Sequence, residues 1–171
     1  HARGVLGAVD CRDDAGQRLA KALAAFRHKP CVVLALPRGG VPVAARVATE
    51  LEAPLDLLLV RKIGAPRQPE LAIGAVIDGG TPIIVLDQEL IRLTGTRAKQ
   101  FDALCAREIA EIERRRKSYL GGRSPPSLRG RIAIVIDDGL ATGNTMRAAL
   151  REKIAGDGGE LPAIEPGGQA E

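Results

Sequence analysis

Two adjacent carboxylates follow a run of five apolar residues near the end of the chain. Residues 132–136 (Ile-Ala-Ile-Val-Ile) have the composition of a buried strand, and Asp137 and Asp138 come directly after them. A buried charge without a partner is costly, so both acids must stay hydrated, pair with a cation or bind a ligand. The position of this acid pair is therefore the first indication of a binding site.

The segment after the acids is suited to holding a phosphate group. Gly139 and Gly143 allow a tight turn that leaves backbone amides uncovered. A helix predicted to begin near Asn144 would direct its free N–H groups and positive dipole end into the same hollow. Further donors come from the side chains of Thr142, Asn144 and Thr145. Because two carboxylates would repel phosphate, we expect them to bind vicinal sugar hydroxyls or a nearby Mg²⁺. The alternative is a plain strand–turn–helix unit in which Asp138 only caps the helix.

Two more segments carry residues that could bind anions. In 36–42, "LPRGGVP", two glycines can turn their amides inward, and Arg38 offers a fork of donors that matches phosphate oxygens. The alternative is an ordinary turn with a surface arginine. In 60–70, "VRKIGAPRQPE", Arg61 and Lys62 open a charged, proline-containing loop, and Arg67 and Glu70 are weaker candidates. Here the alternative is a solvated loop, which we favour for Arg67.

The elements that must position these segments alternate between strands and helices. A helix is expected to begin at Asp13 or Asp14 and to present Leu19, Ala22, Leu23 and Phe26 on one face. Strands are expected at 31–37, 55–60, 71–78, 82–87 and 131–137, helices at 43–51, 88–120 (interrupted near Gly95) and 144–154, and loops at 61–70 and 121–130. This alternation predicts a parallel sheet covered on both faces, with ligands bound beyond the carboxyl ends of its strands. The segments after Leu36, Val60 and Ile136 should then meet on one side.

The stretch "VIDDGLATGNTM" resembles the signature of the type I phosphoribosyltransferases, which bind 5-phosphoribosyl-1-pyrophosphate (PRPP). The resemblance covers roughly residues 10–152. It implies an α/β fold that is type I phosphoribosyltransferase-like, hence Rossmann-like: three α/β/α layers around a mainly parallel central sheet. Asp137 and Asp138 would hold the ribose 2- and 3-hydroxyls and, through water, Mg²⁺. The ribose and 5-phosphate site would be completed by Gly139, Ala141, Thr142, Gly143, Asn144 and Thr145.

The same resemblance assigns the pyrophosphate site and the reaction. Pyrophosphate would lie on Pro37, Arg38, Gly39, Gly40, Arg61 and Lys62. In this family the turn at 37–40 often contains a cis peptide, and the loop that begins at Arg61 closes over the substrate. The implied reaction displaces Mg²⁺-bound pyrophosphate from ribose C1 by a nucleobase-like acceptor through an oxocarbenium-like transition state. Arg61, Lys62, Asp137 and Asp138 would be the catalytic residues.

Composition supports a globular chain and argues against some partners. The chain has 171 residues, a net charge of +4, 2% aromatic residues and no Trp, so a base-stacking nucleic-acid platform is not favoured. The basic run 114–117 has interleaved glutamates and lies at a predicted helix end, where a solvated face is the expected reading. No apolar run approaches the ~20 residues that span a membrane. Cys11, Cys31 and Cys105 show no pairing motif, which suggests reduced thiols in a cytoplasmic protein.

Three classes of function remain open from the sequence. The first is a phosphoribosyltransferase, expected to be a homo-oligomer, specifically a dimer. The second is a regulator that binds PRPP or a nucleotide without transfer. The third is a phosphohydrolase, which ranks last because haloacid-dehalogenase-like enzymes need an Asp-x-Asp arrangement. We expect a phosphoribosyltransferase-like domain over 1–155 and an irregular Gly/Pro-rich tail over 156–171, which would leave the sheet incomplete at its C-terminal end.

Overall fold

The computed structural model describes the backbone of residues 6–78, 82–137 and 144–160; within these ranges, side chains are described outside 6–13 and 144–149. The described residues divide into two compact units. The first unit contains 6–57, 125–137 and 154–160, and the second contains 58–78, 82–124 and 144–153.

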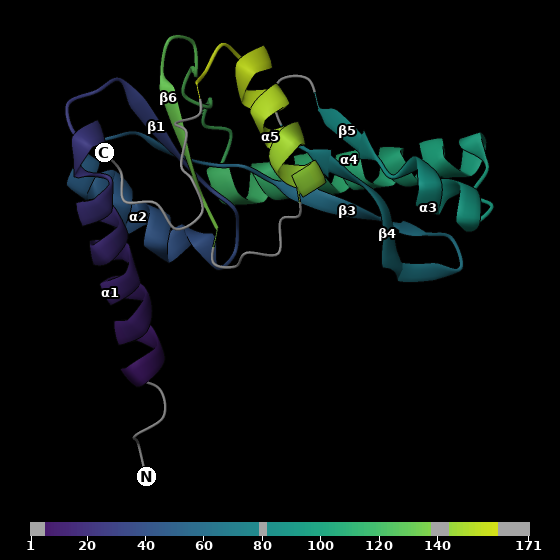
Figure 1. Cartoon of the computed structure of the whole chain (residues 1–171), viewed down its shortest axis with the longest axis horizontal. Helices are drawn as coiled ribbons and strands as arrows, with labels where there is room; N and C mark the ends of the chain where they lie inside the picture. Colours follow the sequence, from purple (N-terminus) through teal and green to yellow (C-terminus); the bar gives the residue numbers. More distant parts are fainter. Residues whose placement is uncertain (1–5, 79–81, 138–143, 161–171) are drawn as a thin grey trace. The chain divides into compact units, whose positions relative to one another are not determined.

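The first unit is built on a three-stranded parallel sheet with strand order β2-β1-β6. Its strands are β1 (Cys31–Ala35), β2 (Leu55–Leu57) and β6 (Ile132–Ile136), and its helices are α1 (Leu6–Ala22), the short 3₁₀ helix η1 (Ala24–Phe26) and α2 (Gly40–Leu51). β1 and β6 pair along their whole length, from Cys31 opposite Ile132 to Ala35 opposite Ile136. The two strands therefore end side by side (Figure 1).

Aliphatic side chains form the core of this unit. All five residues of β1 are buried, as expected of a central parallel strand. α2 places its apolar residues on one side at helical spacing, because Val43, Val47 and Leu51 recur every four positions. These side chains pack against Cys31, Val33, Ala35, Ile134 and Ile136 of the sheet, and against Ala20 and Leu23 from the α1 side.

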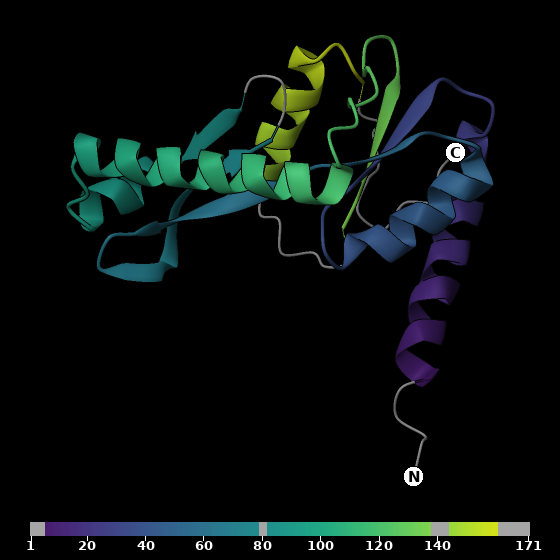
Figure 2. The same cartoon turned by 180° about the vertical axis from the view of Figure 1, so that it is seen from behind.

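The second unit contains an antiparallel sheet with strand order β3-β4-β5. Its strands are β3 (Val60–Ala65), β4 (Gln68–Ile77) and β5 (Ile83–Leu86). Two helices follow, α3 (Gln88–Leu93) and the long α4 (Ala98–Leu120), and α5 (Asn144–Gly156) lies mostly in this unit. Asp87 caps α3 by accepting a hydrogen bond from the Leu90 amide at 3.0 Å. α4 packs along β3 and β4 (Figure 2).

The prediction of a loop over 61–70 is wrong. Residues 60–77 form a β-hairpin whose two-residue turn is Pro66-Arg67. The pairing register of this hairpin shifts on both sides of Gly64. Only glycine fits at this position, because a Cβ would lie 2.2 Å from the Pro69 carbonyl oxygen. The strands at 71–78 and 82–87 are confirmed, but they pair antiparallel in this second sheet and not in the parallel one. Proline and charge within 61–70 had suggested a loop, yet pairing across the hairpin determines its structure.

Smaller differences occur at the ends of the chain. α1 begins at Leu6, well before the cap predicted at Asp13 or Asp14. Beyond α5, Glu160 forms a parallel bridge with Ile132 and exchanges backbone hydrogen bonds with Arg131 and Ala133 at 2.9 and 2.7 Å. Among the described residues, no helix combines the length and apolar character that crossing a bilayer requires.

Candidate functional site

The turn after β1 lies against the end of β6, within the first unit. The Leu36 amide donates to the Ile136 carbonyl at 2.9 Å, and the Gly40 amide donates to the Leu36 carbonyl at 3.1 Å. The turn between them contains Pro37, Arg38 and Gly39, and the Pro37–Arg38 peptide is cis, as in the family that the sequence resembles. Arg38 is exposed, so its guanidinium is accessible to a ligand.

Gly40 allows the closest approach between the turn and the strand. A Cβ built at this position would lie 2.6 Å from the Ile136 carbonyl oxygen and 3.2 Å from the Cα of Asp137. Cβ atoms essentially never come within 3.0 Å of another heavy atom, so only glycine fits here without a shift of the backbone. The sequence analysis predicted that the two glycines turn their amides toward a ligand. The structure gives a second reason for glycine at position 40, because a side chain there would collide with the end of β6.

Asp137 is the first residue after β6 and is exposed. The Pro-Arg-Gly-Gly turn and Asp137 therefore meet at the carboxyl ends of two neighbouring parallel strands, where open α/β sheets bind ligands. Asp138, Gly139, Ala141, Thr142 and Gly143 lie outside the described residues. The backbone of Asn144 and Thr145 forms the first turn of α5, which confirms the helix start that the sequence predicted.

Arg61 and Lys62 point to opposite faces of β3, because side chains alternate along a strand. Arg61 donates from Nε and Nη2 to Oε2 of Glu108 on α4, at 2.9 and 2.8 Å. The Glu108 side chain is only 6% exposed, and its other carboxylate oxygen accepts from Arg107 at 3.1 Å. Lys62 is exposed. The structure thus commits Arg61 to an internal ion pair and leaves Lys62 as the accessible cation of the two.

Glu108 is a residue that the sequence interpretation missed. It lies in phase with the apolar stripe of α4, three residues after buried Cys105 and four before buried Ile112. A carboxylate on this apolar face becomes buried when the helix packs against the sheet. It then needs a cation as partner, because an unpaired buried charge is strongly unfavourable. The signal was present in the helical spacing, but its partner lies 47 positions away in the sequence.

The basic run 114–117 is divided between separate partners. Arg114 and Arg115 both bind Glu111, with Nε–Oε distances of 2.7 Å, and lower the pKa of that carboxyl to about 2. Arg116 instead pairs with Asp78, a buried residue just after β4. The prediction of a solvated face therefore does not hold for the whole run, because Arg116 binds a buried acid.

Other candidate groups show little reactive chemistry. Cys31 and Cys105 are buried free thiols, and burial raises the pKa of both. Within the part of the chain that the structure describes, no group of three or more His, Cys, Asp or Glu side chains could hold a metal ion. Arg67 at the hairpin turn lines an open hollow of about 740 Å³ together with Arg97, Leu93 and Thr94 from the α3–α4 region.

Comparison with known proteins agrees with this geometry. The family model "Phosphoribosyl transferase domain" matches residues 10–160. A curated protein of Mycobacterium tuberculosis (strain ATCC 25618 / H37Rv), named "Putative phosphoribosyl transferase Rv0571c", is 49% identical over 142 residues. That alignment covers 83% of this chain and 32% of the relative, so the chain spans about a third of the length of the curated protein.

Solved structures share the fold. The crystal structure of TT1426 from Thermus thermophilus is 39% identical, with a TM-score of 0.65, over 88% of this chain and 73% of that one. A hypoxanthine phosphoribosyltransferase from Staphylococcus aureus has a TM-score of 0.50 at 12% identity, over 94% and 68% of the two chains, which shows a common fold alone. The match over 10–160 and the shared fold confirm the resemblance seen in the carboxylate signature. The chain therefore belongs to the type I phosphoribosyltransferase family.

Proposed function

We propose that this chain carries a phosphoribosyltransferase site that uses PRPP and Mg²⁺ and transfers the 5-phosphoribosyl group to, or from, a nucleobase-like acceptor. In the forward direction the bond between ribose C1 and the pyrophosphate oxygen breaks. A bond forms between C1 and an acceptor nitrogen, whose proton passes to the departing pyrophosphate or to solvent. Pyrophosphate leaves with the electron pair of the broken bond.

The observation that carries this proposal is the backbone contact between the Pro-Arg-Gly-Gly turn and the end of β6. Gly40 approaches Ile136 and Asp137 so closely that a Cβ would be 2.6 Å from the Ile136 oxygen. A ligand with a diol and a pyrophosphate joined at neighbouring ribose carbons needs acceptors and donors side by side. Asp137 supplies the acceptor and Arg38 with the Gly39 amide supplies donors on the adjoining turn.

Each residue has a distinct task in this proposal. Asp137 and Asp138 accept hydrogen bonds from the ribose 2- and 3-hydroxyls and fix the sugar. Residues 141–145 bind the 5-phosphate through amides and hydroxyls. Arg38 and Lys62 stabilise the charge that develops on the departing pyrophosphate. No nucleophilic side chain is needed, because the acceptor itself attacks C1 and the protein contributes position and electrostatics.

The residues present fit a hydrated Mg²⁺ better than a metal bound only by protein ligands. The described residues hold no cluster of three or more potential ligands, and Asp137 is an exposed carboxylate beside the proposed pyrophosphate turn. Mg²⁺ in protein sites keeps several waters and uses phosphate oxygens, so Asp137 and Asp138 would hold it through water. Once bound, the ion would neutralise the charge of the leaving pyrophosphate.

Arg61 has a different place in the proposal from the one its sequence position suggested. Its guanidinium is bound to buried Glu108 at 2.8 Å, on the face of β3 opposite Lys62. We therefore assign pyrophosphate contact to Lys62 and give Arg61 the task of positioning β3 against α4.

The test is release of pyrophosphate from PRPP by the full chain with Mg²⁺ and a panel of purine and pyrimidine bases. Release that depends on one base and is lost in Lys62→Met would support transfer. Arg67→Met, a nearby exposed arginine at the hairpin turn, is the matched control and should retain the rate. Release that is independent of any base and unchanged in Lys62→Met would contradict the proposal.

A second candidate is a regulator that binds PRPP without transferring it. The internal pairing of Arg61 favours this alternative, because it leaves a single exposed cation at the start of the hairpin. Calorimetry with PRPP and Mg²⁺ separates the two functions. Saturable PRPP binding with no pyrophosphate release across the whole panel would identify the regulator.

A further inference from the structure

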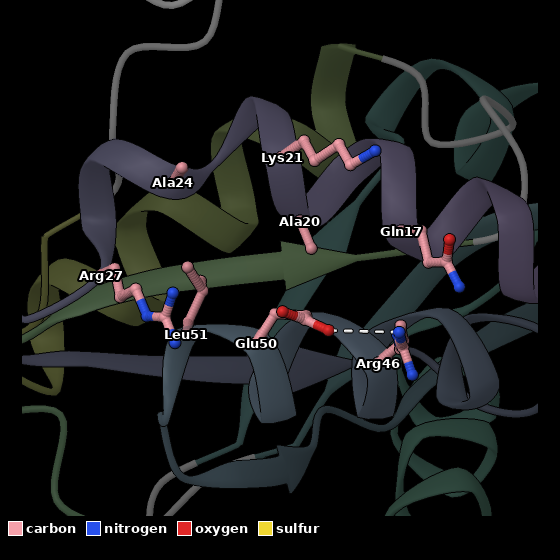
Figure 3. Close-up of a pocket in the computed structure, with 8 residues that line it drawn as sticks. All are labelled: Gln17, Ala20, Lys21, Ala24, Arg27, Arg46, Glu50 and Leu51. Atoms are coloured by element: carbon pink, nitrogen blue, oxygen red, sulfur yellow. Dashed lines mark ion pairs between the residues drawn. The ribbon is translucent and has the colours of Figure 1, made fainter.

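A small hollow lies between α1 and α2 in the first unit, in a part of the fold that the proposed transferase site does not use. Its volume is about 210 Å³. Figure 3 shows its walls: Gln17, Ala20 and Lys21 come from α1, and Arg46, Glu50 and Leu51 come from α2.

Positive charge dominates this hollow. Lys21, Arg27 and Arg46 contribute three cations to its lining, and Glu50 contributes the single carboxylate. Glu50 accepts from Nη2 of Arg46 at 3.2 Å, and Arg27 reaches out of the hollow to Glu52 at 3.3 Å. Lys21 is exposed and can turn toward a ligand that brings negative charge. The lining therefore has a surplus of positive charge around a space that can hold a small anion.

One donor in this hollow lacks an acceptor. The Nε of Arg46 is buried and has no hydrogen-bond partner among the described residues, although the side chain as a whole is 37% exposed. Nearly all buried donors in proteins are paired, so an orphan donor indicates a missing acceptor. Nε and Nη2 lie on one edge of the guanidinium; Nη2 already donates to Glu50, so Nε is the donor on this edge that an anion oxygen would satisfy.

Gly16 allows α1 to pack against the stem of Arg46. A Cβ at Gly16 would lie 2.9 Å from the Arg46 Cβ and 3.1 Å from its Cγ. Because Gly16 has no side chain, α1 can lie directly against the Cβ and Cγ of Arg46. The packing of the two helices thus fixes the start of the arginine side chain and leaves its outer end at the hollow.

We propose that this hollow binds the phosphate group of a small molecule, either free phosphate or a short phosphate ester, with Arg46 as the central ligand and Lys21 and Arg27 as supporting cations. Phosphate is favoured over carboxylate because three cations approach from two helices and the segment after η1, which suits an anion with several oxygens. The site is separate from the proposed PRPP site, which lies where β1 and β6 end, and it does not depend on the proposed function.

The experiment follows backbone amide shifts of the isotopically labelled full chain during titration with inorganic phosphate and, in parallel, with glycerol 3-phosphate. Saturable shifts in residues 15–24 and 43–51 are expected if phosphate enters the hollow. Shifts around 137–145 would report phosphate at the proposed PRPP site, so the two sites are read separately in one titration. Equal affinity for both probes would indicate recognition of phosphate alone, and tighter binding of glycerol 3-phosphate would indicate an ester.

Three variants test the assignment. Arg46→Met keeps an unbranched stem beneath Gly16 and removes the donors, so binding at the hollow should weaken about tenfold or more. Glu50→Gln removes the opposing carboxylate and should tighten phosphate binding about two- to fivefold. Arg18→Met is the matched control, because Arg18 lies on α1 but forms an exposed pair with Asp14 at 2.9 Å. It should bind phosphate like the wild type.

The Glu50→Gln result keeps the test decisive if Arg46→Met folds poorly, since it predicts a gain of affinity that mere loss of structure cannot produce. Wild-type titrations in which shifts occur only around 137–145 would overturn the proposal. Unchanged affinity at the hollow in both Arg46→Met and Glu50→Gln would overturn it as well.

Discussion

Gly40→Ala is the substitution that tests the geometry of the candidate site most sharply. The added Cβ would begin 2.6 Å from the Ile136 carbonyl oxygen, whereas ordinary contacts start at 3.4 Å. The turn or the end of β6 must therefore move by about 0.8 Å, and the neighbouring atom is rigid backbone. Overpacking of this kind costs about 1–3 kcal/mol of unfolding free energy. For a chain of this size, a loss of ~2 kcal/mol lowers Tm by roughly 4–8 °C.

The same displacement should impair ligand binding. It separates the Pro-Arg-Gly-Gly turn from Asp137. In a site where reacting groups are held in position, a misplacement near 1 Å can lower the reaction rate about 100-fold. We expect the Kd for PRPP, measured by calorimetry with Mg²⁺, to rise at least about tenfold. Tm is followed in parallel by differential scanning calorimetry, so that folding and binding are measured on the same variant.

Gly156→Ala is the control for Gly40→Ala. Gly156 is the last residue of α5, and a Cβ there meets nothing within 4 Å. This variant should keep both Tm and PRPP affinity, or gain slightly in stability. Unchanged Tm and affinity in Gly40→Ala would refute the close approach itself. A lower Tm with unchanged PRPP affinity would support the close approach of Gly40 to β6, but it would show that the turn does not bind PRPP.

Three further predictions concern the charged groups. Asp137→Asn combined with Asp138→Asn should weaken PRPP binding more than about tenfold in calorimetry, since each lost charged hydrogen bond costs ~1.5–3 kcal/mol. Glu108→Ala should lower the free energy of unfolding by about 3 kcal/mol in urea, the low end for a broken buried pair because Arg61 keeps 32% of its side chain exposed. A loss below about 1 kcal/mol would contradict a buried pair. Glu111 has a pKa lowered to about 2 by its two arginine partners, so its stabilising effect is present above the unfolded-state pKa of ~4.3 and fades as the pH falls toward 2. The Tm difference between wild type and Glu111→Gln should therefore be largest near neutral pH and vanish near pH 2, whereas a difference that grows with acid would show the opposite linkage.

The part of the fold that the sequence predicted well depends on local signals. β1 and β6 are short aliphatic runs, α2 repeats its apolar residues every four positions, and α5 begins at Asn144, where the sequence predicted a helix start. These patterns report burial and helix starts directly. Two neighbouring parallel strands then place the segments that follow them at one edge, so the meeting of the Pro-Arg-Gly-Gly turn with Asp137 could be anticipated.

The part that the sequence did not predict depends on partners far away in the chain. The hairpin of β3 and β4 is read locally as a loop because of its prolines and charges, but the antiparallel pairing of Gly64 with Ala72 and of Ala65 with Gln68 makes it a hairpin. Arg61 looks like a ligand-binding cation until Glu108, 47 positions later, is folded against it. Arg46 gives no local sign that Gly16 will pack on its stem or that its Nε will be buried without a partner.

The most direct test of the proposed function is a crystal of this chain soaked with ribose 5-phosphate. The ribose diol should lie within hydrogen-bond distance of the carboxylates of Asp137 and Asp138, with the phosphate on the backbone amides of residues 141–145. The C1 side of the sugar should face the Pro-Arg-Gly-Gly turn. A sugar bound elsewhere, or carboxylates of Asp137 and Asp138 held by the protein's own side chains in the complex, would contradict the account.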